Sequence, residues 1–121
     1  MELRDAAEMA ERSREAVERG LPNSLYAVTV VDDVGETVGM ARIVGDRGSV
    51  FHVCDMAVHP DHQRQRLGSR MMDALMDWID ENAPPTAYVN LMADVDGFYE
   101  QWGFERTAPA SKGMYYRVPG E

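Results

Sequence analysis

The chain is poor in cysteine, in lysine and in long hydrophobic runs. Cys54 is the single cysteine among 121 residues, which excludes a disulfide framework and fits a reducing cytoplasm. No apolar stretch approaches the roughly 20 residues that a membrane-spanning helix needs. The first residues are acidic and helical in pattern, unlike a secretory leader. We therefore expect a cytoplasmic protein that does not associate with membranes.

Basic residues are also scarce, with 12 Lys and Arg against 21 Asp and Glu and a formal net charge of −9. This balance argues against nucleic acid as a partner, because non-specific binding of DNA or RNA requires a basic face. Apolar residues make up 45% of the chain, enough to predict a packed core and one domain spanning residues 1–121. Lys112 is the single lysine among the 12 basic residues. Either a high-salt host or GC-rich coding would produce this preference for arginine.

Hydrophobic periodicity predicts a mixed α/β domain with no internal repeat. Apolar residues at three- and four-residue spacing predict a long helix, and Pro84-Pro85 would end it. Met71, Met72 and Met76 of this helix, with Trp78, Tyr88, Trp102 and Phe104, are expected in the core. The expected elements, in chain order, are a helix over 2–19, strands over 24–31, 37–44 and 50–58, a helix over 67–82, a strand over 86–93, a short helix within 94–104 and a strand over 114–118.

The segment HQRQRLGSR, residues 62–70, contains three arginines and no acid, although the chain as a whole is acidic. It joins the central strand to the long helix, and Gly68 would allow a ligand to approach the backbone. Free N–H groups in the first turn of a helix and the helix dipole together favour phosphate. The alternative is a solvated loop whose arginines neutralise nearby carboxylates.

Two segments resemble the GNAT superfamily of N-acetyltransferases. DMAVHPDHQRQRLGSRMMDALMDW, residues 55–78, is similar to the acyl-CoA-binding motif of that superfamily, and GFYEQWGF, residues 97–104, is similar to its second hallmark. The two lie in the family's order, with a helix and a strand between them. Arg66 departs from the pattern because it stands where the family usually has its first glycine. The chain also begins directly in a helix, so the family's usual first strand is missing or supplied differently.

The resemblance implies a mixed, mostly antiparallel central sheet with a splayed central strand and flanking helices. It also implies acetyl-CoA as co-substrate and no metal. The backbone of the central strand would bind the pantetheine arm, and the amides of the following loop would bind the pyrophosphate. The matching positions are Met56, Ala57 and Val58 in the strand and Gln63, Arg64, Gln65, Arg66, Leu67, Gly68 and Ser69 in the loop. Ser69 is also a candidate helix cap.

Three residues are candidates for the acid–base chemistry. Tyr99 matches the family tyrosine that protonates the leaving thiolate, and its alternative role is a structural hydroxyl. His52 and Asp55 are polar residues in an otherwise apolar strand, and either could accept the proton of the amine. Strict alternation would point them to opposite faces. Cys54, between them, is expected to be a packed, non-catalytic residue.

The predicted activity is transfer of an acetyl group from acetyl-CoA to a primary amine of a small molecule or peptide. The acidic surface favours a cationic amine. The sequence leaves open a homodimer, and it leaves two other functions open. One is a non-catalytic acyl-CoA-binding or regulatory domain, and the other is a protein-interaction module whose basic loop meets an acidic partner.

Overall fold

The computed structural model describes residues 13–93 and 95–119, and the helix expected over 2–19 lies partly outside this range. The long helix and the central strand have the predicted bounds, the strand expected over 37–44 is one residue longer, and the other elements are shifted or shorter than expected. The elements are α2 (Arg14–Gly20), the 3-10 turn η1 (Leu21–Asn23), β1 (Tyr26–Val31), β2 (Thr37–Gly45), β3 (Val50–Val58), the 3-10 helix η2 (Pro60–Gln65), α3 (Leu67–Asn82), β4 (Tyr88–Asn90) and the 3-10 helix η3 (Tyr99–Trp102).

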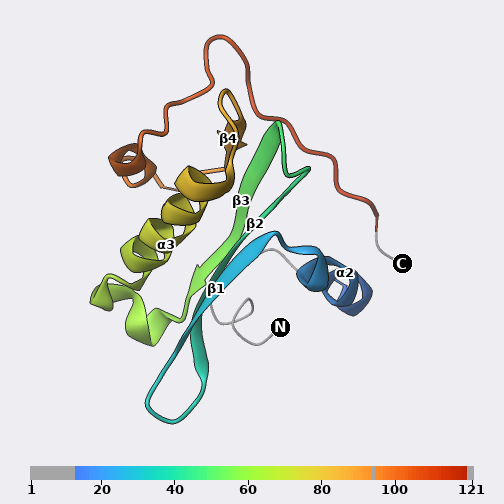
Figure 1. Cartoon of the computed structure of the whole chain (residues 1–121). Helices are drawn as coiled ribbons and strands as arrows, with labels where there is room; N and C mark the ends of the chain where they lie inside the picture. The colour runs from blue at the N-terminus through green and yellow to red at the C-terminus, as the bar shows by residue number, and fades with distance from the viewer. Residues whose placement is uncertain (1–12, 94, 120–121) are drawn as a thin grey trace.

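The four strands form one sheet in the order β1-β2-β3-β4. β1, β2 and β3 pair antiparallel, and β4 pairs parallel to β3 after the α3 crossover. α3 covers one face of this sheet and α2 lies on the other side (Figure 1). The mixed, mostly antiparallel sheet with flanking helices is therefore confirmed.

Two aspartates form the hairpin turns on either side of β2. The Asp32 carboxylate accepts hydrogen bonds from the N–H groups of Val34 and Glu36. The Asp46 carboxylate accepts three backbone N–H groups, from Gly48, Ser49 and Val50, and the Ser49 hydroxyl. These donors, of which the Val50 amide is the strongest, hold the pKa of Asp46 well below its usual range. Side-chain acceptors thus fix the turns that set strand register.

The core lies between α3 and the sheet. Ile43, Phe51, Met72 and Leu75 are almost completely buried, which confirms that the methionines of α3 pack in the core. Trp78 stacks on Tyr26, at 5.5 Å between ring centroids. The other aromatic residues expected in the core are less buried, and Tyr88 is 54% exposed, so its assignment to the core was wrong. Tyr88 is exposed because β4 is the edge strand of the sheet.

β3 separates from β4 after only three paired residues. The parallel ladder runs from Val50–Tyr88 to His52–Asn90 and ends there. On its other edge, β3 continues to pair with β2 as far as Val58, but a bulge interrupts that ladder. Asp55 lies in the bulge with a positive φ of 54°. The splayed central strand is therefore present.

The expected strand over residues 114–118 is not formed. These residues have no regular secondary structure, and their large side chains are exposed. A strand-like composition alone does not form a strand, because a strand needs a partner. In this structure the segment lies away from the edge of β4 (Figure 1). β4 is correspondingly short, three residues where eight had been expected.

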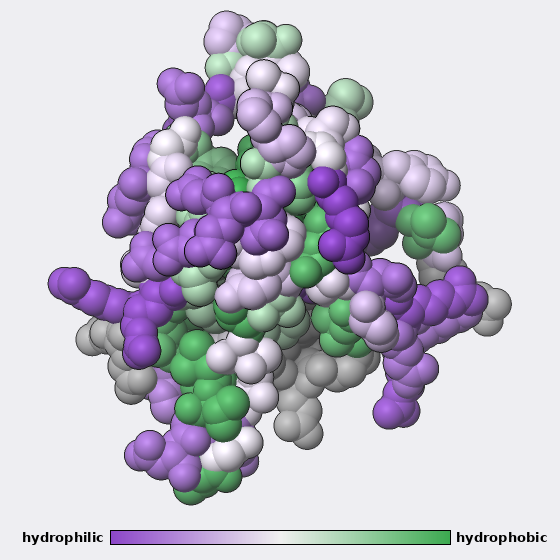
Figure 2. Space-filling view, in the orientation of Figure 1, coloured by the Kyte–Doolittle hydropathy of each residue, from purple (hydrophilic) through white to green (hydrophobic). Residues whose placement is uncertain are grey.

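Hydrophilic side chains dominate the visible face of the molecule, with small hydrophobic patches between them (Figure 2). Within residues 13–93 and 95–119, no helix has the length and apolar character that crossing a membrane requires.

Candidate active site

The separation of β3 from β4 leaves an open backbone edge at the middle of the sheet. Met56, Ala57 and Val58 lie on this part of β3, beyond the last residue paired with β4. Ala57 is buried, whereas Met56 and Val58 are half-buried. The Val58 carbonyl accepts a hydrogen bond from the Gln63 side-chain amide at 3.3 Å. An extended ligand could pair with such an edge through main-chain hydrogen bonds.

The loop after β3 leads into the N-terminus of α3. η2 ends at Gln65, and the next residue, Arg66, adopts a left-handed conformation with a φ of 57° and precedes α3. The Arg70 N–H donates to the Arg66 carbonyl at 3.1 Å and closes the first turn. The preceding N–H groups, those of Leu67, Gly68 and Ser69, therefore have no acceptor within the helix. These N–H groups and the helix dipole together would favour an anion at this end of α3.

Ser69 does not cap α3, contrary to the expectation from the sequence. The cap position belongs to Arg66, whose side chain makes no capping hydrogen bond. Ser69 lies two residues inside the helix, because α3 begins at Leu67 rather than after the serine. Its backbone N–H remains one of the free donors of the first turn.

Two arginines of this region, Arg66 and Arg70, are exposed. Neither forms an ion pair with an acid in the described part of the chain. For these two residues, the alternative of arginines that neutralise nearby carboxylates is not supported. His59 and His62 flank the same loop, and the described residues contain no group of three or more His, Cys, Asp or Glu that could hold a metal ion.

Tyr99 begins η3, which packs against the first half of α3. A Cβ atom added at Gly68 would lie 3.5 Å from the ring of Phe98, the neighbour of Tyr99. The Trp102 indole N–H donates to the Asp73 carboxylate at 2.9 Å. These contacts place Tyr99 on the same side of the molecule as the free N–H groups of α3.

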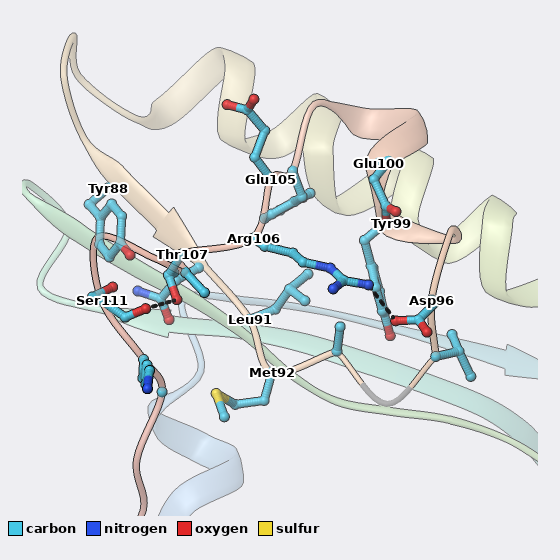
Figure 3. A pocket seen from close by; sticks show the side chains of 17 residues that line it. Tyr88, Leu91, Met92, Asp96, Tyr99, Glu100, Glu105, Arg106, Thr107 and Ser111 are labelled. Atoms are coloured by element: carbon cyan, nitrogen blue, oxygen red, sulfur yellow. Dashed lines mark hydrogen bonds and ion pairs between the residues drawn. The ribbon is translucent and has the colours of Figure 1, made fainter.

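Tyr99 also lines a pocket of about 520 Å³ between β4, η3 and the C-terminal segment. Its half-buried ring makes edge-to-face contacts with Phe98 and Phe104. The side chain extends from η3 into this pocket, near the ion pair of Arg106 with Asp96 (Figure 3). The hydroxyl of Tyr99 is therefore directed toward a space that a ligand could enter.

His52 is held at the point where β3 and β4 separate. Its Nδ1 atom lies 2.6 Å from Oδ1 of Asn90, the residue it faces on β4. An oxygen acceptor at this distance favours the tautomer with the proton on Nδ1, which leaves Nε2 as the basic nitrogen. Asn90 also lines the pocket that contains Tyr99. His52 is thus linked to that pocket through one hydrogen bond.

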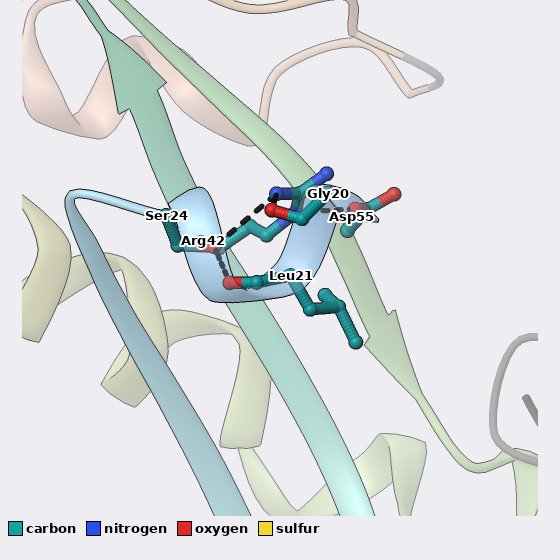
Figure 4. A network of polar contacts seen from close by, with 5 residues as sticks. All are labelled: Gly20, Leu21, Ser24, Arg42 and Asp55. Atoms are coloured by element: carbon teal, nitrogen blue, oxygen red, sulfur yellow. Dashed lines mark hydrogen bonds and ion pairs between the residues drawn. The ribbon is translucent and has the colours of Figure 1, made fainter. Parts of the chain in front are cut away.

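Asp55 forms a short ion pair with Arg42 of β2, at 2.6 Å from Nε to Oδ2. The two side chains are only 14% and 17% exposed. Arg42 also donates from Nη1 to the Gly20 carbonyl and the Ser24 hydroxyl, at 3.1 and 3.2 Å (Figure 4). One guanidinium therefore connects the bulge of β3 to the end of α2.

The bulge changes the direction of Asp55 from the one that alternation predicts. Arg42 lies between the buried Ala41 and Ile43, so it points to the face opposite α3. His52 and Cys54 share that face, because they pair with Val44 and Arg42. Asp55 reaches the same face by its contact with Arg42, so the expectation that His52 and Asp55 point opposite ways was wrong. The cause is the extra residue of the bulge.

Sequence reasoning missed two residues of this region, Asn90 and Arg42. Arg42 is the only charged residue in the run TVGMARIV, and that isolation was a usable signal for a buried partner on the next strand. Asn90 is likewise the one strongly polar residue of YVNLM. Its alignment with His52 depends on strand register, which a parallel crossover does not reveal in the sequence.

A larger hollow, of about 980 Å³, lies over β1 and β2 and reaches the loop after β3. Its lining includes Arg42, His59 and His62, together with three acids, Asp32, Glu36 and Asp61. It therefore extends the open region from the bulge toward the hairpin of β1 and β2.

Comparison with known proteins identifies the family. Residues 23–106 match the profile described as the Acetyltransferase (GNAT) domain. An uncharacterized N-acetyltransferase, ycf52, from Pyropia yezoensis is 27% identical over 118 residues, which cover 95% of this chain and 68% of that protein.

Solved structures agree with this match. A probable acetyltransferase of unknown function from methicillin-resistant Staphylococcus aureus is 41% identical, with a TM-score of 0.91 and coverage of 97% of this chain and 89% of that one. A GNAT-family acetyltransferase from Streptococcus pneumoniae is 28% identical, with a TM-score of 0.73 and coverage of 99% and 88%. The free strand edge, the helix N-terminus and the tyrosine of η3 thus occur in a chain that belongs to the GNAT family of acetyltransferases.

Proposed function

We propose that the protein transfers an acetyl group from acetyl-CoA to a primary amine by direct attack of the amine. The observation that carries this proposal is the end of the β3–β4 ladder at His52 and Asn90, from which the open edge of β3 runs on to Val58 and the loop that enters the N-terminus of α3. A strand edge that can pair with an amide-containing arm then leads to free N–H groups that suit a pyrophosphate.

The donor groups fit the shape and charge of acyl-CoA. Met56, Ala57 and Val58 offer backbone groups for the pantetheine amides. The loop residues Gln63, Arg64, Gln65 and Arg66, followed by Leu67, Gly68 and Ser69, offer amides for the pyrophosphate. In a chain of net charge −9, such local donors are needed to hold an anion, and backbone amides require little ordering. Acyl-CoA supplies the activated acetyl group, and the protein supplies positions and protons.

Tyr99 acts as general acid toward the leaving sulfur. Its hydroxyl projects into the pocket beside β4, and a phenol with an ordinary pKa near 10 can protonate a departing thiolate. η3 holds the tyrosine through the packing of Phe98 near Gly68 and the Trp102–Asp73 hydrogen bond. These contacts fix the acid relative to the amides of α3.

His52 accepts the proton of the amine, and Asp55 has a structural role. The hydrogen bond to Asn90 orients the His52 ring and leaves Nε2 available as a base. Asp55 instead pairs with Arg42, which makes it a poorer proton acceptor than a free carboxylate. We assign Asp55 to stabilisation of the bulge that separates β3 from β4.

The test measures thiol release from acetyl-CoA with a panel of primary amines, and CoA binding by calorimetry. We expect turnover by the parent protein and a fall in kcat of at least about tenfold for Tyr99→Phe, because general acid catalysis contributes mainly in the transition state. CoA affinity should change little. Tyr26→Phe is the control, since it removes a hydroxyl from a ring that stacks on Trp78.

Two outcomes would contradict the proposal in different ways. Equal rates for the parent and Tyr99→Phe would remove Tyr99 from the mechanism. CoA binding without turnover of any amine would favour the alternative of a non-catalytic acyl-CoA-binding domain, and no CoA affinity at low salt would leave an interaction module.

A further inference from the structure

η3 is too small to hold its own position in the molecule. It has four residues, and none of them is buried. The Gln101 side-chain amide donates to the Phe98 carbonyl at 2.9 Å. The Gly103 N–H donates to the Glu100 carbonyl at 3.0 Å. Both bonds are local, so they shape the turn without attaching it to another element. The position of Tyr99 therefore depends on contacts between η3 and the rest of the molecule.

Trp102 attaches η3 to α3. Its indole N–H donates to the Asp73 carboxylate at 2.9 Å, across 29 positions of the sequence. Asp73 lies in the second turn of α3 and is exposed. The helix is held in the core through other residues, among them the fully buried Met72 and Leu75. Asp73 therefore contributes to the placement of η3 rather than to the packing of its own helix.

A continuous set of ring contacts connects Trp102 to Tyr99. The Phe98 ring lies 5.1 Å from that of Trp102 and 5.0 Å from that of Tyr99, between centroids. Tyr99 also contacts Phe104, at 6.5 Å. Closely packed side chains transmit displacement from one to the next. A shift of the indole would therefore move the tyrosine, whose side chain extends into the pocket beside β4 (Figure 3).

The same end of α3 carries the N–H groups that we propose bind the pyrophosphate. Phe98 lies close to these groups, because a Cβ atom added at Gly68 would be 3.5 Å from its ring. Gly68 and Asp73 are roughly 7.5 Å apart along the axis of the helix, at about 1.5 Å per residue. η3 thus contacts one rigid helix at two points, one beside the proposed pyrophosphate site and one at Asp73.

We propose that Asp73 is a positioning residue for the reaction. By accepting the Trp102 hydrogen bond, it holds η3 on α3 and fixes the Tyr99 hydroxyl relative to the amides of α3. This role rests on the proposed function, because Asp73 acts through Tyr99. General acid catalysis is sensitive to such placement, since the proton is transferred only over hydrogen-bond distance.

Substitutions at the two ends of this bond test the role by steady-state kinetics of acetyl transfer and by calorimetry of CoA binding. Trp102→Phe removes the indole N–H and keeps an aromatic ring beside Phe98, and Asp73→Leu removes the acceptor. We expect each to lower kcat about fivefold and to change CoA affinity little, since misplacement of the acid affects mainly the transition state. Asp73→Asn keeps an acceptor oxygen and should retain most of the activity. Asp77→Asn, one turn further along α3 at another exposed aspartate, is the control for charge.

The Tyr99→Phe background separates positioning from general damage to the fold. If Asp73 acts through Tyr99, Trp102→Phe should lower kcat little further in a chain that already carries Tyr99→Phe. Damage to the fold would lower kcat by the same factor in both backgrounds.

The outcomes also separate this role from the proposed function. Unchanged kcat in Trp102→Phe and Asp73→Leu, an equal loss in Asp77→Asn, or equal losses with and without the Tyr99 hydroxyl would overturn the role of Asp73 and leave acetyl transfer in place. A parent protein without turnover would overturn the proposed function, and the role of Asp73 with it.

Discussion

At the scale of single residues, Arg66 shows how the protein tolerates a departure from its family pattern. The family usually has glycine at this position, and the structure gives the reason, because Arg66 has a φ of 57°. Left-handed backbone is open to glycine and costs other L-residues about 1–2 kcal/mol. The arginine adopts this left-handed conformation and adds an exposed positive charge beside the free amides of α3.

Arg66→Gly should therefore stabilise the fold. Relief of the left-handed conformation is partly offset by the greater entropy of glycine in the unfolded chain, so we expect the free energy of unfolding to rise by about 0.5–1 kcal/mol. Unfolding in urea measures this change in the free energy of unfolding. Arg66→Ala is the control, because it removes the same charge but keeps the Cβ atom. If the two variants are equally stable, the left-handed conformation carries no cost.

Residue identity was sufficient to select Tyr99 as a candidate, because its neighbours form a recognisable motif. The partners of His52 and Asp55 could not be predicted, because Asn90 and Arg42 are distant from them in sequence. A polar residue in an apolar strand indicates that it has a partner, but it does not identify that partner.

At the scale of elements, the bulge in β3 is the feature that opens the site. It turns β3 away from β4 while the pairing with β2 continues. The bulge is held by the ion pair of Asp55 with Arg42, and Arg42 is held in turn by Gly20 and Ser24. The edge of β3 that we propose binds acyl-CoA therefore depends on contacts made on the far face of the sheet.

Arg42→Met should destabilise the protein by about 2 kcal/mol, a value between those of exposed and fully buried pairs. The substitution leaves the nearly buried Asp55 carboxylate without its cation. The double variant Arg42→Met, Asp55→Asn should therefore lose less stability than Arg42→Met alone. CoA affinity should also fall, because the bulge loses the ion pair that holds it. Arg106→Met is the control, because its pair with Asp96 is 79% and 93% exposed and should change stability by less than about 0.5 kcal/mol. Equal losses at the two sites would contradict a special role for Arg42.

Elements were predictable where local pattern and tertiary packing agree. β3 and α3 have the predicted bounds because each has a continuous apolar face buried in one core. The segment over 114–118 has an equally good strand pattern, but it lies away from the edge of β4 (Figure 1) and has no partner strand among the residues that the structure describes. Sequence pattern therefore indicates what a segment can form, and the rest of the molecule determines whether it does.

At the scale of the whole molecule, the net charge of −9 favours cationic amines as acceptors in the proposed reaction. The acids Asp32, Glu36 and Asp61 line the hollow over β1 and β2, so the negative potential extends toward the loop after β3. Such a field raises the local concentration of cationic substrates and is screened by salt. The basic residues beside α3 are the local exception, which suits an anionic donor next to a cationic acceptor.

The salt dependence of kcat/KM should therefore increase with the charge of the acceptor. From about 0.02 to 0.5 M salt the screening length falls from roughly 20 Å to about 4 Å, so long-range attraction is largely lost. We expect kcat/KM for a diamine to fall up to about tenfold, and that for a monoamine of equal length to fall clearly less. Saturating acetyl-CoA at each salt concentration excludes an effect on donor binding. Equal decreases in kcat/KM for the two amines would show that the acidic surface does not select the acceptor. Selection would then depend on contacts within the pocket.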